Sequence, residues 1–78
     1  GRAMNWQQHI AADPKICHGK PCIRGTRILV STVLDNLAAG ETHETILDQY
    51  PGLTEEHIRS CLAYAADLAH GRYLDISA

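Results

Sequence analysis

The sequence of 78 residues lacks most of the features that mark enzymes and membrane proteins. It has no apolar run approaching the roughly 18 residues of a transmembrane helix. It shows no internal repeat, no low-complexity segment and no recognisable secretory signal. A chain of this length buries only about 60% of its unfolded surface, so a deep substrate pocket would consume most of its core. We therefore expect one small domain that gains from a partner or a second copy.

Cysteine is scarce, and its odd count argues against a disulfide framework. Cys17, Cys22 and Cys61 without a secretory signal favour free thiols in a reducing cytosol, so we expect a cytoplasmic protein. The run Cys17-His18-x-x-x-Cys22, with Cys61 as a candidate fourth ligand, supplies soft metal ligands. Its spacing matches no zinc-finger pattern, and Cys61 lies in an apolar helical stripe where a buried thiol is commoner. We expect no metal and no cofactor.

Catalytic signatures are also missing. Cys17 and His18 are neighbours that would point to opposite faces of a strand, so adjacency does not make them a nucleophile and its base. The run Gly19-Lys20-Pro21 lacks the further glycine and the hydroxyl residue of a phosphate loop. The histidines are scattered along the chain at His9, His18, His43, His57 and His70. We predict that the protein is not an enzyme.

What the chain does have is an uneven division of charge. Residues 1–40 carry five lysines and arginines against two carboxylates, a net of +3, whereas residues 41–78 carry two against seven, a net of -5. No acidic residue lies between Lys15 and Arg27. This asymmetry predicts a basic face for one partner and an acidic face for another. The alternative is ordinary solubilising charge.

Turn-forming and β-forming residues dominate residues 5–30. The segment Gly19–Val30, which we call the basic ribbon, combines turn signals with three cations. Arg24-Gly25-Thr26 offers a tight reversal, with Ile23 on one side and Ile28 and Val30 on the other. We expect a small hairpin there, joined by an earlier strand around residues 7–11.

Three helices are predicted over residues 31–71. The first begins near Ser31 as its cap and ends at Gly40, which suits a left-handed position. The second begins after Thr42 and is stopped by Pro51-Gly52.

The third helix begins after Thr54, has Glu55 and Glu56 in its first turn, and ends at Gly71. His57 stands where a capping box requires Glu or Gln, so we expect an incomplete box. The short connection between the last two helices is typical of a helix-turn-helix. The predicted fold is therefore mainly α, a three-helix bundle with a short N-terminal β hairpin.

The predicted organisation is a single domain over residues 4–71. It comprises a hairpin region at 5–30 and the helical bundle at 31–71. Residues 72–78 are expected to form a tail, and residues 1–3, ahead of Met4, look like an expression remnant.

A set of residues spread over most of the chain resembles one known family, the domain-of-unknown-function 433 family, over about residues 10–66. The matching residues are Asp13-Pro14, Ile16-Cys17, Gly19-Lys20-Pro21, Ile23, Gly25-Thr26-Arg27-Ile28, Val30, Gly40, Ile46, Tyr50-Pro51, Leu53-Thr54 and Ile58. Leu29 stands where many members place proline. The resemblance implies a bacterial protein with a homeodomain-like helix-turn-helix behind a β element. It also implies an antitoxin-like role, with a PIN-like ribonuclease toxin as the partner.

Two sets of candidate binding residues follow from charge and position. The DNA-binding candidates are Lys15, Lys20, Arg24, Thr26 and Arg27 in or beside the basic ribbon, and His57, Arg59 and Ser60 on the third helix. A two-stranded ribbon fits a major groove, and its cations would hold phosphates. The alternative is that Gly25-Thr26-Arg27 makes only a turn and that Arg27 pairs with a carboxylate. Glu55 and Glu56 would repel phosphates, which makes the third helix the weaker reader of DNA.

The partner-binding candidates are the acidic residues Glu41, Glu44, Asp48, Glu55 and Glu56. Their negative face would block a positively charged groove of a ribonuclease by complementarity. Three functions stay open at this point. They are an antitoxin that also binds operator DNA as a homodimer, a stand-alone DNA-binding regulator, and a protein-interaction module without DNA affinity.

Overall fold

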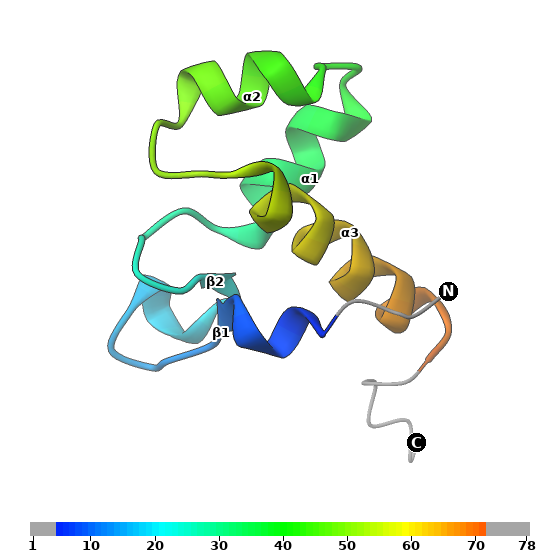
Figure 1. Cartoon of the computed structure of the whole chain (residues 1–78). Coiled ribbons are helices and arrows are strands. Elements are labelled where there is room, and N and C mark those ends of the chain that lie inside the picture. The colour runs from blue at the N-terminus through cyan, green and yellow to red at the C-terminus, as the bar shows by residue number, and fades with distance from the viewer. Residues whose placement is uncertain (1–4, 72–78) are drawn as a thin grey trace.

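A computed structural model describes residues 5–71 and shows three helices above a short N-terminal β element (Figure 1). The elements in chain order are the 3₁₀ turn η1 (Trp6–Gln8), strand β1 (Ile10–Ala11), the turn η2 (Cys17–Gly19), strand β2 (Cys22–Ile23) and the helices α1 (Val30–Ala38), α2 (His43–Gln49) and α3 (Glu55–Ala69). The predicted mainly α class with an N-terminal hairpin is confirmed. The predicted expression remnant and tail lie outside the described residues. None of the helices within residues 5–71 has the length and apolar character to cross a membrane.

The β element is smaller than predicted. β1 and β2 pair antiparallel, with Ile10 opposite Ile23 and Ala11 opposite Cys22. The predicted turn forms, because Gly25 adopts a φ of +81° that L residues rarely adopt. The predicted strand after this turn is reduced to a single bridge between Cys22 and Leu29, since the chain enters α1 at the next residue.

Helix α1 begins with a backbone partner instead of the predicted serine cap. Leu29 occupies the N-cap position and makes no side-chain capping bond. The first helical amide, that of Val30, donates to the carbonyl of Pro21 at 3.0 Å. The prediction that Ser31 caps the helix is therefore wrong, because the carbonyl of Pro21, just before β2, already supplies an acceptor at this end.

Glycine ends α1 as predicted. Gly40 has a φ of +92°, and its amide donates to the carbonyl of Leu37 at 3.0 Å. The amide of Glu41 donates to the carbonyl of Asn36 at 3.0 Å. These two bonds form a Schellman motif, which turns the chain sharply toward α2.

Threonine caps begin α2 and α3, as predicted. The hydroxyl of Thr42 accepts from the amide of Thr45 at 3.1 Å. At α3, the hydroxyl of Thr54 accepts from the amide of His57 at 3.2 Å, and Nδ1 of His57 accepts from the amide of Thr54 at 3.2 Å. The expectation of an incomplete capping box is therefore wrong, because an imidazole nitrogen replaces the usual carboxylate as the acceptor.

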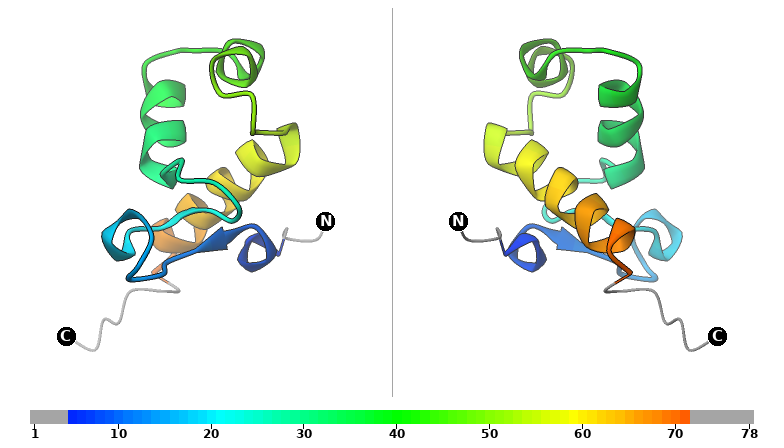
Figure 2. Two further views of the ribbon diagram at one scale, coloured as in Figure 1. Left: turned by 90° about the vertical axis from the view of Figure 1, so that its left-hand side faces the viewer. Right: turned by 90° about the vertical axis from the view of Figure 1, so that its right-hand side faces the viewer.

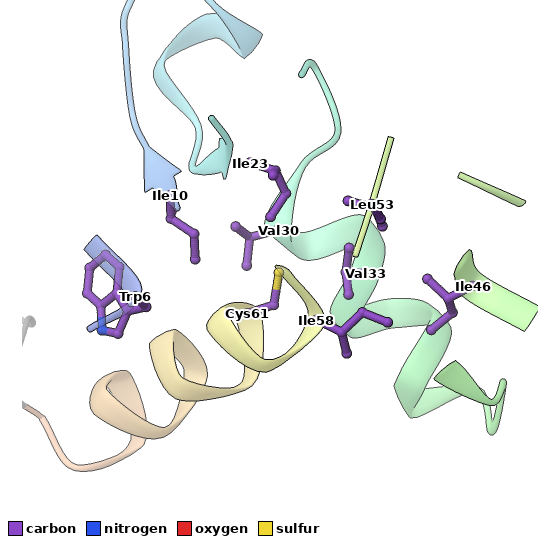
Figure 3. Close-up of a cluster of buried hydrophobic side chains, with 9 residues drawn as sticks. All are labelled: Trp6, Ile10, Ile23, Val30, Val33, Ile46, Leu53, Ile58 and Cys61. Carbon is purple, nitrogen blue, oxygen red and sulfur yellow. The ribbon is translucent and has the colours of Figure 1, made fainter. Parts of the chain in front are cut away.

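The core combines residues of the N-terminal β element with residues of all three helices (Figure 3). Its buried cluster consists of Trp6, Ile10, Ile23, Val30, Val33, Ile46, Leu53, Ile58 and Cys61. Trp6 anchors the N-terminal turn on α3, since its Nε1 donates to Asp67 Oδ2 at 2.7 Å and its ring meets Tyr64 edge-on at 4.9 Å between centroids. The β element is thus part of the domain's single core.

The capping role of His57 makes stability depend on pH. Burial, with a smaller contribution from His9, lowers the pKa of His57 below its ordinary 6.5. The unfolded chain therefore takes up this proton at a higher pH than the folded chain does. The contribution is complete above about pH 6.5, and it is lost as the pH falls through the lowered pKa.

We expect the free energy of unfolding, measured by urea titration, to fall as the pH is lowered below about 6.5. His57→Gln should remove this part of the pH dependence, because Gln completes a capping box without titrating in this range. His57→Ala should cost about 1 kcal/mol at neutral pH. An unchanged pH dependence in His57→Gln would contradict the assignment.

Candidate functional site

Four cations at the β end of the molecule point to solvent. Lys15, Lys20, Arg24 and Arg27 are all exposed. The guanidinium of Arg24 donates to the carbonyl of Gln7 through two nitrogens at 3.3 and 3.2 Å, which fixes its direction. Within residues 5–71 the side chains of the other three make no ion pair, so the expected alternative of an Arg27–carboxylate pair is not found there.

Thr26 holds the shape of the ribbon. Its hydroxyl donates to the carbonyl of Ile23 at 2.8 Å and accepts from the amide of Ile28 at 3.0 Å. A shallow depression of about 260 Å³ lies beside this turn, lined by Ile16, Gly25, Thr26 and Arg27. The Thr26 methyl would be 3.9 Å from a Cβ placed on Gly52, so the ribbon lies against the turn between α2 and α3. Thr26 positions the neighbouring cations, and its hydroxyl is already engaged on both sides.

The third helix offers little for DNA. His57 is half-buried, completes the capping box and meets the His9 ring edge-on at 5.5 Å between centroids. Ser60 is 0% exposed, and its hydroxyl donates to the carbonyl of Glu56 at 2.9 Å. The prediction that Ser60 faces outward is wrong, because the N-terminal segment packs along this flank of α3 (Figure 2). Arg59 is exposed as predicted.

The outward face of α3 is acidic at its start and apolar further along. Glu55 and Glu56 are exposed and lie one helical turn before Arg59. Leu62 is 42% exposed, and Ala66, one turn on, is also exposed. A single cation between two carboxylates and an apolar patch is not the basic footprint of a DNA-reading helix.

The acidic residues gather on and around α2 (Figures 1 and 2). All five partner-binding candidates are exposed, namely Glu41, Glu44, Asp48, Glu55 and Glu56, and we call this set the acidic pole. Glu41, Glu44 and Asp48 lie on or beside α2, far from β1 and β2, whereas Glu55 and Glu56 begin α3, next to the turn that the ribbon contacts. His43 Nδ1 lies 2.7 Å from Glu55 Oε2, which ties the start of α2 to the start of α3. The acidic half of the sequence thus stays together on and around α2 and at the start of α3.

Sequence reasoning missed two features near β2. The first is a groove of about 390 Å³, lined by Lys20, Pro21, Val30, Ser31, Leu34, Tyr64 and Leu68. It arises where the ribbon, α1 and α3 meet, which no local pattern reveals. The second is the placement of Cys17 and Cys22, whose thiols donate to the carbonyls of Arg27 at 3.4 Å and Thr26 at 3.9 Å. Their spacing suggested only a metal site.

The remaining cysteine lies elsewhere. Cys61 is 0% exposed and points into the core (Figure 3). Burial raises the pKa of its thiol to about 11, which makes it a poor nucleophile. Within residues 5–71, no three metal-ligating side chains come together.

These features define a small helix-turn-helix domain whose N-terminal β element is built into its core. The chain belongs to the family described as "Protein of unknown function (DUF433)", which matches residues 10–65. The membership inferred from the Gly25-Thr26-Arg27-Ile28 motif is confirmed.

Two relatives support this assignment. The uncharacterized protein y4eO of Sinorhizobium fredii (strain NBRC 101917 / NGR234) is 39% identical over 56 residues, which is 72% of this chain. The chain spans about a quarter, 25%, of that relative's length. The crystal structure of a DUF433 member protein from Anabaena variabilis ATCC 29413, at 2.00 Å resolution, matches with a TM-score of 0.75 and 30% identity. That match covers 92% of this chain and 71% of the other.

The positioning role of Thr26 can be tested by removing its hydroxyl while keeping its shape. Thr26→Val leaves the Ile28 amide without its acceptor, and we expect a loss of about 1–3 kcal/mol in the free energy of unfolding measured in urea. Thr26→Ser keeps the hydroxyl and should retain most of the stability. Equal stability of the Val variant and the native chain would contradict the role.

Proposed function

We propose that this protein is an antitoxin-like module that occludes a basic partner nuclease with its acidic pole and holds DNA phosphates with its basic ribbon. The observation that carries this proposal is that one small domain exposes an acidic set on and around α2 and a basic set in the turns around β1 and β2. A protein that must meet both a positively charged groove and a polyanion requires such a division. The mechanism is occlusion and electrostatic positioning, with no chemistry.

The acidic pole suits a nuclease groove for two reasons. Glu55 and Glu56 lie in the first turn of α3, where the helix dipole favours their negative charge. A ribonuclease of the PIN-like class, which the family resemblance suggests, binds a polyanion and so must offer a positive groove. Leu62 lies on the same helix and supplies the apolar area that the centre of a protein interface requires.

The basic ribbon suits a phosphate backbone more than a base sequence. Lys20 and Arg27 are exposed and make no ion pair within residues 5–71, so their charge is available to a polyanion. Phosphate contacts supply affinity and register and carry no sequence information by themselves. In a homodimer, which we also propose, two ribbons would double the number of phosphates contacted.

The two other functions differ from this one in what they bind. A stand-alone regulator would bind duplex DNA with no protein partner, and it would need a reading surface that the acidic start of α3 does not favour. A protein-interaction module would bind the partner and show no affinity for a duplex. Reversing charge at each end of the molecule in turn separates the three.

The acidic pole is tested by co-expression with the product of the neighbouring gene, followed by pull-down and an affinity measurement. Asp48→Lys should weaken the complex by about tenfold or more, because it places a like charge against a basic groove. Asp35→Lys is the matched control, since Asp35 is also an exposed helical aspartate but lies on α1 outside the acidic pole. Equal effects of the two variants, or the absence of any complex, would contradict the antitoxin role.

The ribbon is tested by titrating the protein with a DNA duplex at several salt concentrations. Lys20→Ala combined with Arg27→Ala should lower the slope of log K against log salt by about 0.9 for each phosphate contact removed. Arg59→Ala, on α3, should leave the slope unchanged. A larger effect of Arg59→Ala would make α3 the reader, and no duplex binding at low salt would leave a protein-interaction module.

A further inference from the structure

Two cysteines lie on the same side of the ribbon turn. Cys17 comes from η2 and Cys22 from β2, and their thiols donate to the carbonyls of Arg27 and Thr26 at 3.4 and 3.9 Å. Both thiols therefore face the same short stretch of backbone, residues 26–27. After burial, the neighbouring Cys17 side chain is the main cause of the raised pKa of the Cys22 thiol.

The backbone at Cys17 and His18 adopts a strained, left-handed conformation. Cys17 and His18 have φ values of 53° and 56°, in the left-handed region, and Gly19 continues the run at 80°. Each L residue held there costs about 1–2 kcal/mol. The turn is closed by the amide of Lys20, which donates to the carbonyl of Cys17 at 3.0 Å. Strained backbone that the surroundings maintain is a feature of functional segments.

We propose that Cys17 and Cys22 form a reversible intrachain disulfide by exchange with a low-molecular-weight disulfide such as oxidised glutathione, and that this oxidation reshapes the basic ribbon. Nothing in the proposed function requires this modification, and only its effect on DNA affinity rests on that function. Cys17 and Cys22 are suited to this reaction because only four residues separate them and both thiols face residues 26–27.

The order of the two steps follows from exposure. Cys17 is half-buried and Cys22 is only 2% exposed, so the Cys17 thiolate meets the external disulfide first. It bonds to one glutathione sulfur and expels the other glutathione as a thiolate, which takes up a proton. The Cys22 thiol then loses its proton, attacks the Cys17 sulfur and expels the second glutathione. Two protein thiols are oxidised, and one external disulfide is reduced to two thiols.

Oxidation removes both thiol protons that are donated to carbonyls of the ribbon. Neither sulfur of a disulfide carries a proton, so the carbonyls of Thr26 and Arg27 lose the bonds they accept from the thiols. These two residues form the turn that presents Arg27 to solvent. Cys22 also bridges to Leu29 and pairs with Ala11, so a change at its side chain acts on both neighbours of β2.

The disulfide is tested by mass spectrometry on the full chain. The protein is equilibrated in glutathione buffers of increasing oxidised fraction, quenched in acid, alkylated while unfolded and digested with trypsin. Cys17 and Cys22 share one peptide, Ile16–Arg24, because trypsin does not cut before Pro21. We expect this peptide to carry no alkyl group after oxidation and to appear about 2 Da, the mass of two hydrogens, below its free dithiol mass, while Cys61 remains fully alkylated.

Two variants serve as controls. Cys61→Ala should form the disulfide at the same glutathione ratio as the native chain. Cys22→Ser should stop at a mixed disulfide with glutathione on Cys17, because the second thiol is missing. A native chain that also stops at the mixed disulfide, or that forms only a disulfide between two chains, would overturn the proposal.

The effect on the ribbon is tested by amide hydrogen exchange in the reduced and oxidised protein. The amides of Thr26 and Ile28 close the turn, and we expect both to exchange severalfold faster after oxidation. The amide of Tyr50 at the end of α2 should be unaffected. Unchanged exchange at Thr26 and Ile28 would overturn the coupling between the disulfide and the ribbon.

Duplex binding in both redox states separates this proposal from the proposed function. A different affinity in the two states is the expected result, and an equal affinity would overturn an effect on binding. If neither state binds a duplex, the DNA-binding part of the proposed function fails, while the mass and exchange measurements still decide the disulfide.

Discussion

The two residues of β2 are the constraint on which the rest of the structure depends. Ile23 is 0% exposed in the core, and its strand pairs with β1 on one side and bridges to Leu29 on the other. The carbonyl of Pro21, the residue before β2, accepts a hydrogen bond from the first amide of α1. A two-stranded element is marginal by itself in water, and here it is stable because the same residues also enter the helical core. The strands, the start of α1 and the hydrophobic cluster therefore share one anchor.

This anchor also positions Arg24, one of the exposed cations. Arg24 follows directly after the two buried residues of β2, and its side chain is exposed. The backbone of Arg24 is held in turn by the carbonyl of His9, at 2.8 Å. The positive charge of the ribbon is thus set on a backbone that the core makes rigid, whereas surface cations on a free loop would lose more entropy on binding a polyanion.

Local chemistry in the sequence predicted the helix ends well, because caps are decided by a few adjacent residues. Thr42, Thr54 and Gly40 all act as their residue types indicate. The failures share one physical cause, which is a partner distant in sequence. Ser31 loses its capping role to Pro21, and Ser60 is covered by the N-terminal segment, whose packing along α3 no local pattern predicts. Of the candidate site, the exposed charges could be predicted, while the engagement of Thr26 and the placement of Cys17 beside Cys22 depend on tertiary folding.

The fold suggests that α3 binds DNA, whereas the charge distribution favours a protein partner for α3, and we give more weight to the charge. A helix-turn-helix is commonly used to place its last helix in a DNA groove, but fold alone does not define function. Here that helix begins with Glu55 and Glu56 and continues with the exposed Leu62, which suits a protein surface better than a phosphate backbone. The cations lie instead in the turns and loops around β1 and β2. The helices of this domain are therefore better suited to a protein partner, and the ribbon that completes their core is the part suited to a polyanion.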